Sequence, residues 1–538
     1  MAMRPTPTNL SPTTTTRLPV LVLLATLCVV AGCSTTPGPE ADPSSTTVAT
    51  TSGHLHGSAT DTGRTFLGVP YAEPPTGEHR WSLPRAVAAP DADVDATRAG
   101  SPCPQSLPVP GDHPEPSEDC LTLNVTTPHQ TDSDMHLPVM VWWHGGGYTS
   151  GAGSSYDAQR LADRGNVIVV TVNYRLGIFG YLGMPGMTGG GDFGLADQIE
   201  SLRWVQSNAS AFGGDPDDVT VFGESAGAMS ACAALTSPTT EGLFDKAVMA
   251  SGNCMLRWPD GGLYPGVPAH TPYTSRTDNQ STSVAAARRL GCVGDDAVAC
   301  LRRLPVSRLL RENDEFSDNL TFGTDLLPDD PAEVIRRGDQ HRIPVITGGN
   351  HDEQRSFVGG LLTAQPDAVT PATYPALIRT AFGQRAPEVL SRYPLSRFPS
   401  APIAWSTVTT DAVWSCPTLE GARLMSVRAP THVYEFADET APNVNQITTI
   451  PQGAAHATDT PYYFDLGGMN LLTEPHQRQI ADQMIDYWTS FAHTGTPTIT
   501  GGPGVTAADA DTSRVLQFGT ATTRDVDYAA DHQCDFWI

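Results

Sequence analysis

The stretch Val219-Thr220-Val221-Phe222-Gly223-Glu224-Ser225-Ala226-Gly227 decides the fold. Its first four residues are apolar or β-branched and predict a buried strand, and residues 228–235 are helix formers. In such a strand–turn–helix, a G-x-S-x-G turn exposes the central serine, and small residues two positions away on either side prevent crowding. We therefore predict that Ser225 is a nucleophile at the N-terminus of a helix, whose dipole points at the site.

Strands and helices alternate around this turn. Residues 138–143 and 167–174 predict two more buried strands, and residues 195–212 carry apolar side chains at helical spacing. Strand–helix–strand alternation is typical of a mainly parallel sheet covered on both faces. Earlier in the chain, residues 65–75 and their surroundings predict short antiparallel strands. The predicted fold class is α/β, with a large, mostly parallel sheet flanked by helices and a small N-terminal antiparallel region.

A glycine-rich loop, His144-Gly145-Gly146-Gly147-Tyr148, follows the first of these buried strands. Backbone N–H groups of glycines can approach a developing oxyanion because no side chain intervenes. We predict that Gly146, Gly147 and Ala226 donate these hydrogen bonds, and we interpret His144 as a residue that shapes the loop. The alternative is a glycine loop that serves only to turn the chain.

The N-terminus carries an export pattern. Two arginines precede the apolar run of residues 18–30, which is shorter than the roughly 20 residues of a membrane-spanning helix. The run ends in Val30-Ala31-Gly32-Cys33, which resembles a bacterial lipoprotein signal. This resemblance implies cleavage before Cys33, lipidation of its sulfur and attachment to the outer side of the cell membrane through that lipid. Full secretion after an ordinary signal peptide is the alternative.

The export pattern also bears on the organisation of the rest of the chain and on its cysteines. Residues 34–52 are rich in Ser, Thr and Pro and predict a flexible tether. The predicted organisation is therefore a signal peptide (1–32), a tether (33–52) and a single domain (53–538). Export to an oxidising compartment makes the remaining cysteines disulfide candidates, although their pairing stays open at this point. These are Cys103, Cys120, Cys232, Cys254, Cys292, Cys300, Cys416 and Cys534.

Composition excludes some partners. The formal charge is −26 and the chain has a single lysine, Lys246, whereas phosphate binding needs basic clusters. We therefore expect no nucleic-acid partner. No group of His, Cys, Asp and Glu has metal-ligand spacing in the sequence, so we expect neither a metal nor a cofactor.

Several motifs in order carry a resemblance to a known family. Over residues 53–537 the chain resembles the type-B carboxylesterase and cholinesterase group of the α/β-hydrolase fold. This resemblance implies hydrolysis of small carboxylic esters by a serine, an acid and a histidine in that chain order. The motifs are residues 66–75, Ser117-Glu118-Asp119-Cys120-Leu121-Thr122-Leu123-Asn124-Val125, the glycine loop, Asn173-Tyr174-Arg175-Leu176-Gly177, Phe212-Gly213-Gly214-Asp215-Pro216 and the serine turn.

The resemblance also implies the partners of Ser225. The family's acid follows an apolar strand, and Gly348-Gly349-Asn350-His351-Asp352-Glu353 matches its pattern, which makes Glu353 the acid and Asp352 the alternative. The base is His456, with small residues before it and an acidic residue three positions after it. His476, His493 and His532 are its competitors.

In this scheme His456 accepts the proton of Ser225, Glu353 orients the imidazole, and an acyl-enzyme forms. Because the base must be neutral, an ordinary histidine pKa predicts activity that rises between about pH 6 and 7. The resemblance places Glu224 beside this histidine, and a packed, hydrogen-bonded carboxylate is the alternative role for it.

The family further implies three disulfides, Cys103–Cys120, Cys292–Cys300 and Cys416–Cys534, and leaves Cys232 and Cys254 as free thiols or a fourth bond. Cholinesterases hold a cationic substrate on a tryptophan in the first disulfide loop, but residues 104–119 contain no Trp, Tyr or Phe. We therefore expect an uncharged ester as substrate. A lipase acting on longer-chain acylglycerols and a non-catalytic cholinesterase-like binding protein are the alternatives.

Overall fold

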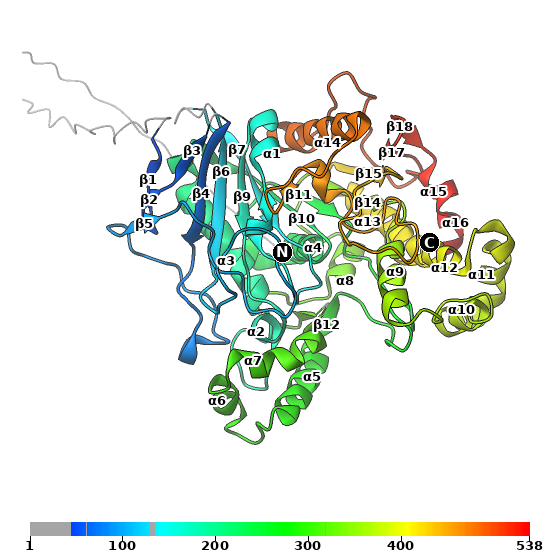
Figure 1. Cartoon of the computed structure of the whole chain (residues 1–538), viewed down its shortest axis with the longest axis horizontal. Coiled ribbons are helices and arrows are strands. Elements are labelled where there is room, and N and C mark those ends of the chain that lie inside the picture. The colour runs from blue at the N-terminus through cyan, green and yellow to red at the C-terminus, as the bar shows by residue number, and fades with distance from the viewer. Residues whose placement is uncertain (1–44, 61, 130–134, 318) are drawn as a thin grey trace, which may run out of the picture. The chain divides into compact units, whose positions relative to one another are not determined.

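An 11-stranded sheet with strand order β18-β17-β15-β14-β11-β10-β7-β9-β6-β4-β3 forms the centre of the structure (Figure 1). The computed structural model describes residues 45–538 apart from 61, 130–134 and 318. The strands are β3 (Ser58–Thr60), β4 (Gly63–Pro70), β6 (Thr122–Pro128), β7 (Leu137–Trp143), β9 (Ile168–Val172), β10 (Gly214–Glu224), β11 (Lys246–Ala250), β14 (Val345–Asn350), β15 (Thr431–Ala437), β17 (Val515–Gly519) and β18 (Thr523–Val526).

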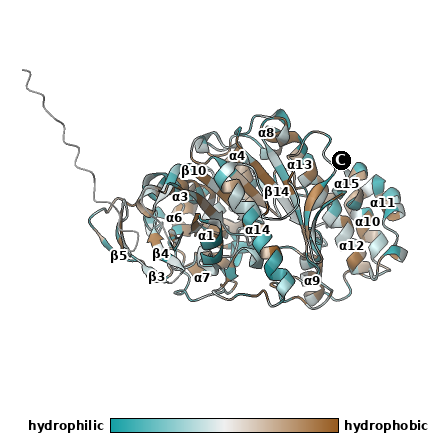
Figure 2. Ribbon diagram, turned by 90° about the horizontal axis from the view of Figure 1, so that it is seen from above, coloured by the Kyte–Doolittle hydropathy of each residue, from teal (hydrophilic) through white to brown (hydrophobic). Residues whose placement is uncertain are grey.

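The strand pairs from β9 through to β17 are parallel, and those at the two ends of the sheet are antiparallel. Alternate side chains of each strand face two separate apolar cores. On β7, Val139 and Val141 pack with α3 (Phe193–Asn208) and α4 (Ala226–Thr236), whereas Met140 and Trp142 pack with α1 (Gln159–Gly165) and α14 (Pro475–Thr494). Figure 2 shows the apolar residues gathered along the inner strands. The predicted α/β fold class is therefore confirmed.

The N-terminal boundary differs from the prediction. Strand β1 (Thr47–Thr50) lies inside the segment expected to be a flexible tether, and it pairs with β2 (Gly53–His56) in a small sheet completed by β5 (Asp93–Asp95). The prediction failed because threonine-rich composition masked a strand alternation that buries Val48 and Thr50. The signal peptide and Cys33 lie outside the described residues. Within the described part of the chain, no helix is both long and apolar enough to cross a membrane.

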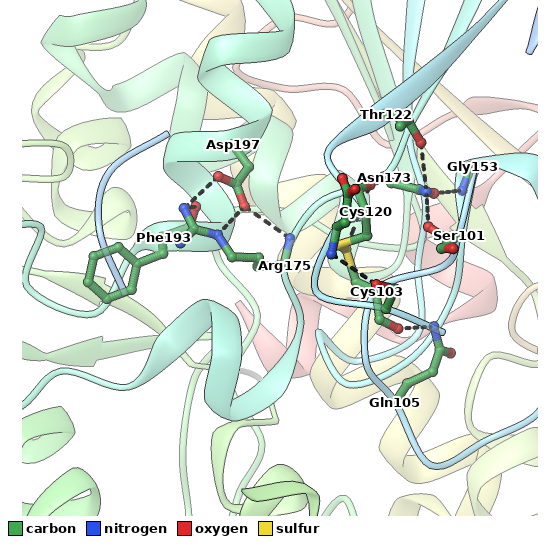
Figure 3. Close-up of a disulfide and its surroundings, with 12 residues drawn as sticks. Ser101, Cys103, Gln105, Cys120, Thr122, Gly153, Asn173, Arg175, Phe193 and Asp197 are labelled. Carbon is green, nitrogen blue, oxygen red and sulfur yellow. Dashed lines mark hydrogen bonds and ion pairs between the residues drawn. A yellow bond between two sulfur atoms is a disulfide. The ribbon is translucent and has the colours of Figure 1, made fainter. Parts of the chain in front are cut away.

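Four disulfides are present. Three are the pairs that the family resemblance implies, and the fourth joins Cys232 on α4 to Cys254 after β11. Figure 3 shows Cys103–Cys120 beside Asn173, whose side-chain amide accepts a hydrogen bond from Gly153 N at 2.8 Å. The same view shows Arg175 and Asp197, which form a buried ion pair at 2.7 Å. These interactions tie the segment after β9 to residue Gly153 and to α3.

The C-terminal segment is held to the sheet by a buried histidine. His532 lies between α15 (Tyr528–Asp531) and α16 (Cys534–Trp537), next to the Cys416–Cys534 disulfide. Its Nδ1 is 2.7 Å from Asp411 and its Nε2 is 2.6 Å from Glu435 on β15. Burial acts to lower the pKa of His532, but the two carboxylates outweigh it and raise the pKa to about 10. The imidazole is therefore charged at neutral pH.

We predict that His532→Asn strongly destabilises the protein at pH 7. Removing the imidazolium leaves Asp411 and Glu435 as unpaired buried charges, which costs roughly 3–5 kcal/mol. Because the folded-state pKa is raised, this contribution is complete below pH 6.5 and is lost as the pH rises through about 10. Urea unfolding across that range measures both effects, with the exposed His493→Asn as control. Equal midpoints for the two variants would contradict the prediction.

Candidate active site

Ser225 occupies a strained turn between β10, which ends at Glu224, and α4, which begins at Ala226. Its φ of 55° lies in the left-handed region that non-glycine residues rarely adopt. A side chain at Gly227 would overlap the carbonyl oxygen of Trp143, and one at Gly223 would strike the backbone of Gly227. The two glycines are therefore needed for α4 to approach the strands this closely, as the sequence predicts.

The structure brings Ser225, His456 and Glu353 together, although they are far apart in the sequence. Ser225 Oγ is 2.8 Å from His456 Nε2, and His456 Nδ1 is 2.6 Å from Glu353 Oε2. The second oxygen of Glu353 accepts a hydrogen bond from Asn350 N at 2.8 Å. A carboxylate at Nδ1 keeps the proton on that nitrogen, so Nε2 is free to accept the serine proton.

The loop that carries His456 is tied to the end of β14. Asn350 Nδ2 donates to Ala455 O at 2.6 Å, and Asp352 N donates to Ala454 O at 2.9 Å. The Asp352 carboxylate pairs with Arg355 at 2.8 Å and with the ring of His351 at 3.2 Å. Asp352, the alternative acid, is thus engaged elsewhere, and Glu353 is the residue that faces the imidazole.

A second carboxyl group faces the same imidazole. Glu224 Oε1 is 3.2 Å from His456 Nε2, and the Glu224 side chain is buried. Burial raises the pKa of Glu224 to about 8, against the opposing effect of His456. Burial also acts to lower the pKa of His456, but Glu224 and Glu353 outweigh it, so that its pKa lies above the ordinary value. The pH window expected from an ordinary histidine therefore moves upward.

Two aromatic rings pack against His456. The ring centroid of Trp414 is 4.9 Å from the imidazole and that of Phe357 is 5.0 Å away. Trp414 Nε1 donates to Gln354 Oε1 at 2.9 Å, and the ring of Trp258 meets Trp414 edge-on at 5.6 Å. No sequence motif identified these aromatic residues, because only the tertiary fold brings their segments together.

The glycine loop lies opposite Ser225. Gly146 and Gly147 line the same pocket as Ser225, and Ala226 is the first residue of α4. In the described chain the backbone N–H groups of these three residues donate no hydrogen bond, so they are available to an oxyanion. His144 hydrogen-bonds Gly145 O through Nδ1 at 2.8 Å and stacks on Tyr174 at 4.4 Å. It therefore shapes the loop, in agreement with the sequence.

The pocket over Ser225 encloses about 380 Å³. No residue of the 104–119 loop lines it, but five aromatic rings from other segments do. The composition of that one loop therefore does not describe the pocket as a whole. The aromatic lining residues are Tyr156, Trp258, Tyr264, Phe357 and Trp414.

One group of side chains has the proximity expected of metal ligands. Potential ligand atoms of His351, Asp531 and His532 lie within 4.8 Å of one another. Both ring nitrogens of His532, however, already hydrogen-bond to carboxylates. A metal would have to displace one of these buried bonds, so the group does not fit a preformed metal centre.

Comparison with known proteins agrees with this geometry. Residues 44–537 match the Carboxylesterase family. A para-nitrobenzyl esterase of Bacillus subtilis (strain 168) is 32% identical over 475 residues, which are 84% of this chain and 90% of that protein. A cocaine esterase of Homo sapiens is 31% identical over 479 residues, which are 82% of this chain and 81% of that protein.

A solved structure of an esterase is also similar to this chain. A thermophilic PNB esterase superposes with a TM-score of 0.75 at 28% identity, covering 91% of this chain and 99% of that one. The family resemblance seen in the sequence is therefore confirmed. This chain belongs to the carboxylesterase family and is a carboxylic ester hydrolase with the α/β-hydrolase fold.

Proposed function

We propose that the protein is a serine carboxylesterase that works through a Ser225–His456–Glu353 triad and an acyl-enzyme. The observation that carries this proposal is the continuous chain of short contacts from Ser225 Oγ to His456 and on to Glu353, at 2.8 and 2.6 Å. Family membership supports ester hydrolysis, and the presence of all three residues argues against a non-catalytic binding role.

In the first half-reaction, Ser225 Oγ bonds to the ester carbonyl carbon and its proton passes to His456 Nε2. The carbonyl electron pair moves onto the oxygen, which the N–H groups of Gly146, Gly147 and Ala226 stabilise. The C–O bond to the alcohol then breaks, and the leaving oxygen takes the proton from His456. Glu353 stabilises the imidazolium throughout.

In the second half-reaction, water gives a proton to His456 and its oxygen bonds to the acyl carbon. Collapse of this intermediate releases the carboxylic acid and returns the proton to Ser225. Because the pocket of about 380 Å³ lies near the lower end of small-molecule sites, we propose esters with compact acyl groups as substrates. We propose that these esters are uncharged, because residues 104–119 supply no aromatic ring that could hold a cation. The same size disfavours long-chain acylglycerols.

The serine assignment is tested by substitution. We predict that Ser225→Ala and Glu353→Gln each lower kcat for a p-nitrophenyl ester by about 10⁴-fold or more, because members of a triad act as a unit. Ser201→Ala, which removes another buried hydroxyl from α3, is the matched control and should retain activity. Full activity in Ser225→Ala would refute the proposal.

The pH dependence of the activity tests whether Glu224 raises the pKa of His456. His456 must be neutral to act as a base, so activity is lost as the pH falls through its pKa. We therefore predict that the rising limb of the pH–activity profile lies above pH 6 to 7, the range expected for an ordinary histidine. Glu224→Gln removes a carboxylate that raises this pKa, so the limb should move down by about one pH unit. The profile of kcat/KM measures the shift, and the exposed Glu388→Gln is the charge-matched control. An unchanged limb in Glu224→Gln would contradict this account.

Acyl-chain length tests the substrate class. Along a series of p-nitrophenyl esters, we predict the highest kcat/KM for acetate and butanoate. The value for palmitate should be lower by about tenfold or more, because a close-packed pocket resists extra methylenes. Ser225→Ala provides the background rate. A maximum at palmitate would favour a lipase instead.

A further inference from the structure

Residues 258–270 form a loop that contributes to the wall of the pocket over the serine turn. The two ends of the loop are joined, because Trp258 and His270 exchange backbone hydrogen bonds at 2.9 and 3.1 Å and their rings stack at 4.9 Å. Surface loops with joined ends frequently carry function. Leu263 and Tyr264, near the middle of the loop, line the pocket together with Trp258. We call residues 258–270 the pocket loop.

The pocket loop becomes more exposed toward its middle. Trp258 is 1% exposed, whereas Tyr264 is 37% exposed and is the most exposed of the five aromatic residues that line the pocket. The Tyr264 ring meets the ring of Phe357 edge-on at 6.4 Å, and Phe357 packs against His456 at 5.0 Å. Tyr264 therefore lies at the mouth of the pocket, one ring away from the proposed base.

Two turns bring Tyr264 to the tip of the pocket loop. Gly261 N donates to Val267 O at 2.8 Å, and Val267 N donates to Tyr264 O at 3.1 Å. Gly261 and Gly266 have φ values of 70° and 88°, which residues with a side chain rarely adopt. The backbone of the loop itself thus sets the direction in which its tip points.

One buried side chain holds the pocket loop to the rest of the site. Gln354 directly follows Glu353 and is fully buried. Its Nε2 donates to Gly262 O at 3.1 Å, and its Oε1 accepts a hydrogen bond from Trp414 Nε1 at 2.9 Å. The two ends of one amide group therefore connect the pocket loop to the ring that packs against His456.

Gln354 is in turn oriented by a π-helical turn, η8 (Thr410–Ser415), which also carries Trp414. Gln354 N donates to Thr410 Oγ1 at 3.1 Å. π-helical turns are rare and frequently occur at functional sites. Because both the backbone and the side chain of Gln354 are hydrogen-bonded to this turn, the amide is held with its Nε2 toward the pocket loop.

The position of Tyr264 bears on the size of the substrate. The pocket encloses about 380 Å³, so an ester with a long chain must extend through the mouth. The Tyr264 ring stands at this mouth and meets such a chain first. Since packed sites discriminate between ligands that differ by single methylene groups, a ring in this place limits ester length.

We propose that Tyr264 is a specificity-determining residue that limits the length of the ester by closing the mouth of the pocket, and that Gln354 is a positioning residue that holds the pocket loop there. Both roles rest on the proposed function, since they concern the same pocket.

The role of Tyr264 is tested with Tyr264→Ala and three esters. Ethyl acetate is the short reference, ethyl hexanoate lengthens the acyl part, and hexyl acetate lengthens the alcohol part. We expect the ratio of kcat/KM for a long ester to that for ethyl acetate to rise about tenfold for at least one long ester, which identifies the part that meets Tyr264.

Val293→Ala is the control for Tyr264→Ala, because it shortens an exposed apolar side chain of another loop outside the pocket. It should leave both ratios unchanged. Ratios that stay the same or fall in Tyr264→Ala, or that rise equally in Val293→Ala, would overturn the role of Tyr264.

The role of Gln354 is tested with Gln354→Met, which keeps the length of the side chain and removes both of its side-chain hydrogen bonds. We expect the ratio that rises in Tyr264→Ala to rise about fivefold here. A loss of folded protein lowers the rates for all three esters equally, so the ratio distinguishes positioning from destabilisation. Gln198→Met, which removes another buried amide from α3, should not change the ratio. An unchanged ratio in Gln354→Met would overturn the positioning role.

Binding to full-length proteins that carry Ser225→Ala makes the test independent of catalysis. Quenching of tryptophan fluorescence would give Kd for the same three esters, with and without Tyr264→Ala or Gln354→Met. Each second substitution should tighten binding of the long ester relative to ethyl acetate, and unchanged relative Kd values would overturn the proposal. If the native protein hydrolyses none of the esters, the proposed function fails, but the Kd values still decide the roles of Tyr264 and Gln354.

Discussion

The close approach of α4 to the end of β7 is the constraint on which the site depends. Gly227 lies against the carbonyl of Trp143, and this contact forces Ser225 into a left-handed conformation that costs about 1–3 kcal/mol. The hydrogen bond from Ser225 N to Ala250 O at 2.9 Å and the cores on both faces of the sheet maintain the turn. Since Trp143 is followed directly by the glycine loop, one packing contact positions both the proposed nucleophile and the proposed oxyanion donors.

The groups that contact the two ring nitrogens distinguish His456, which can act as a base, from His532, which cannot. His456 and His532 each contact two carboxyl groups, but only His456 has a hydroxyl within hydrogen-bonding distance of Nε2. Both nitrogens of His532 are held by carboxylates, which makes it a structural cation. Glu224 lies beside His456 and raises the pKa of this proposed base, although it is not one of the three residues of the proposed triad.

Local patterns predicted part of this structure and missed the rest for physical reasons. The serine turn, the glycine loop and the buried strands are encoded by neighbouring residues, so spacing alone indicated them. Glu353 and His456 required the family resemblance, because no local rule links them to Ser225. The position of Trp414 beside His456 depends on contacts between distant segments, and β1 was hidden by its composition. Lipidation of Cys33 stays a prediction.

The central claim is that Ser225 is a nucleophile activated by His456, and covalent labelling tests it most directly. The folded protein would be treated with a fluorophosphonate, digested and analysed by mass spectrometry. The account predicts one adduct per chain, on the peptide that contains Ser225, and no adduct after unfolding in urea. An unlabelled folded protein, or an adduct on a different serine, would contradict it.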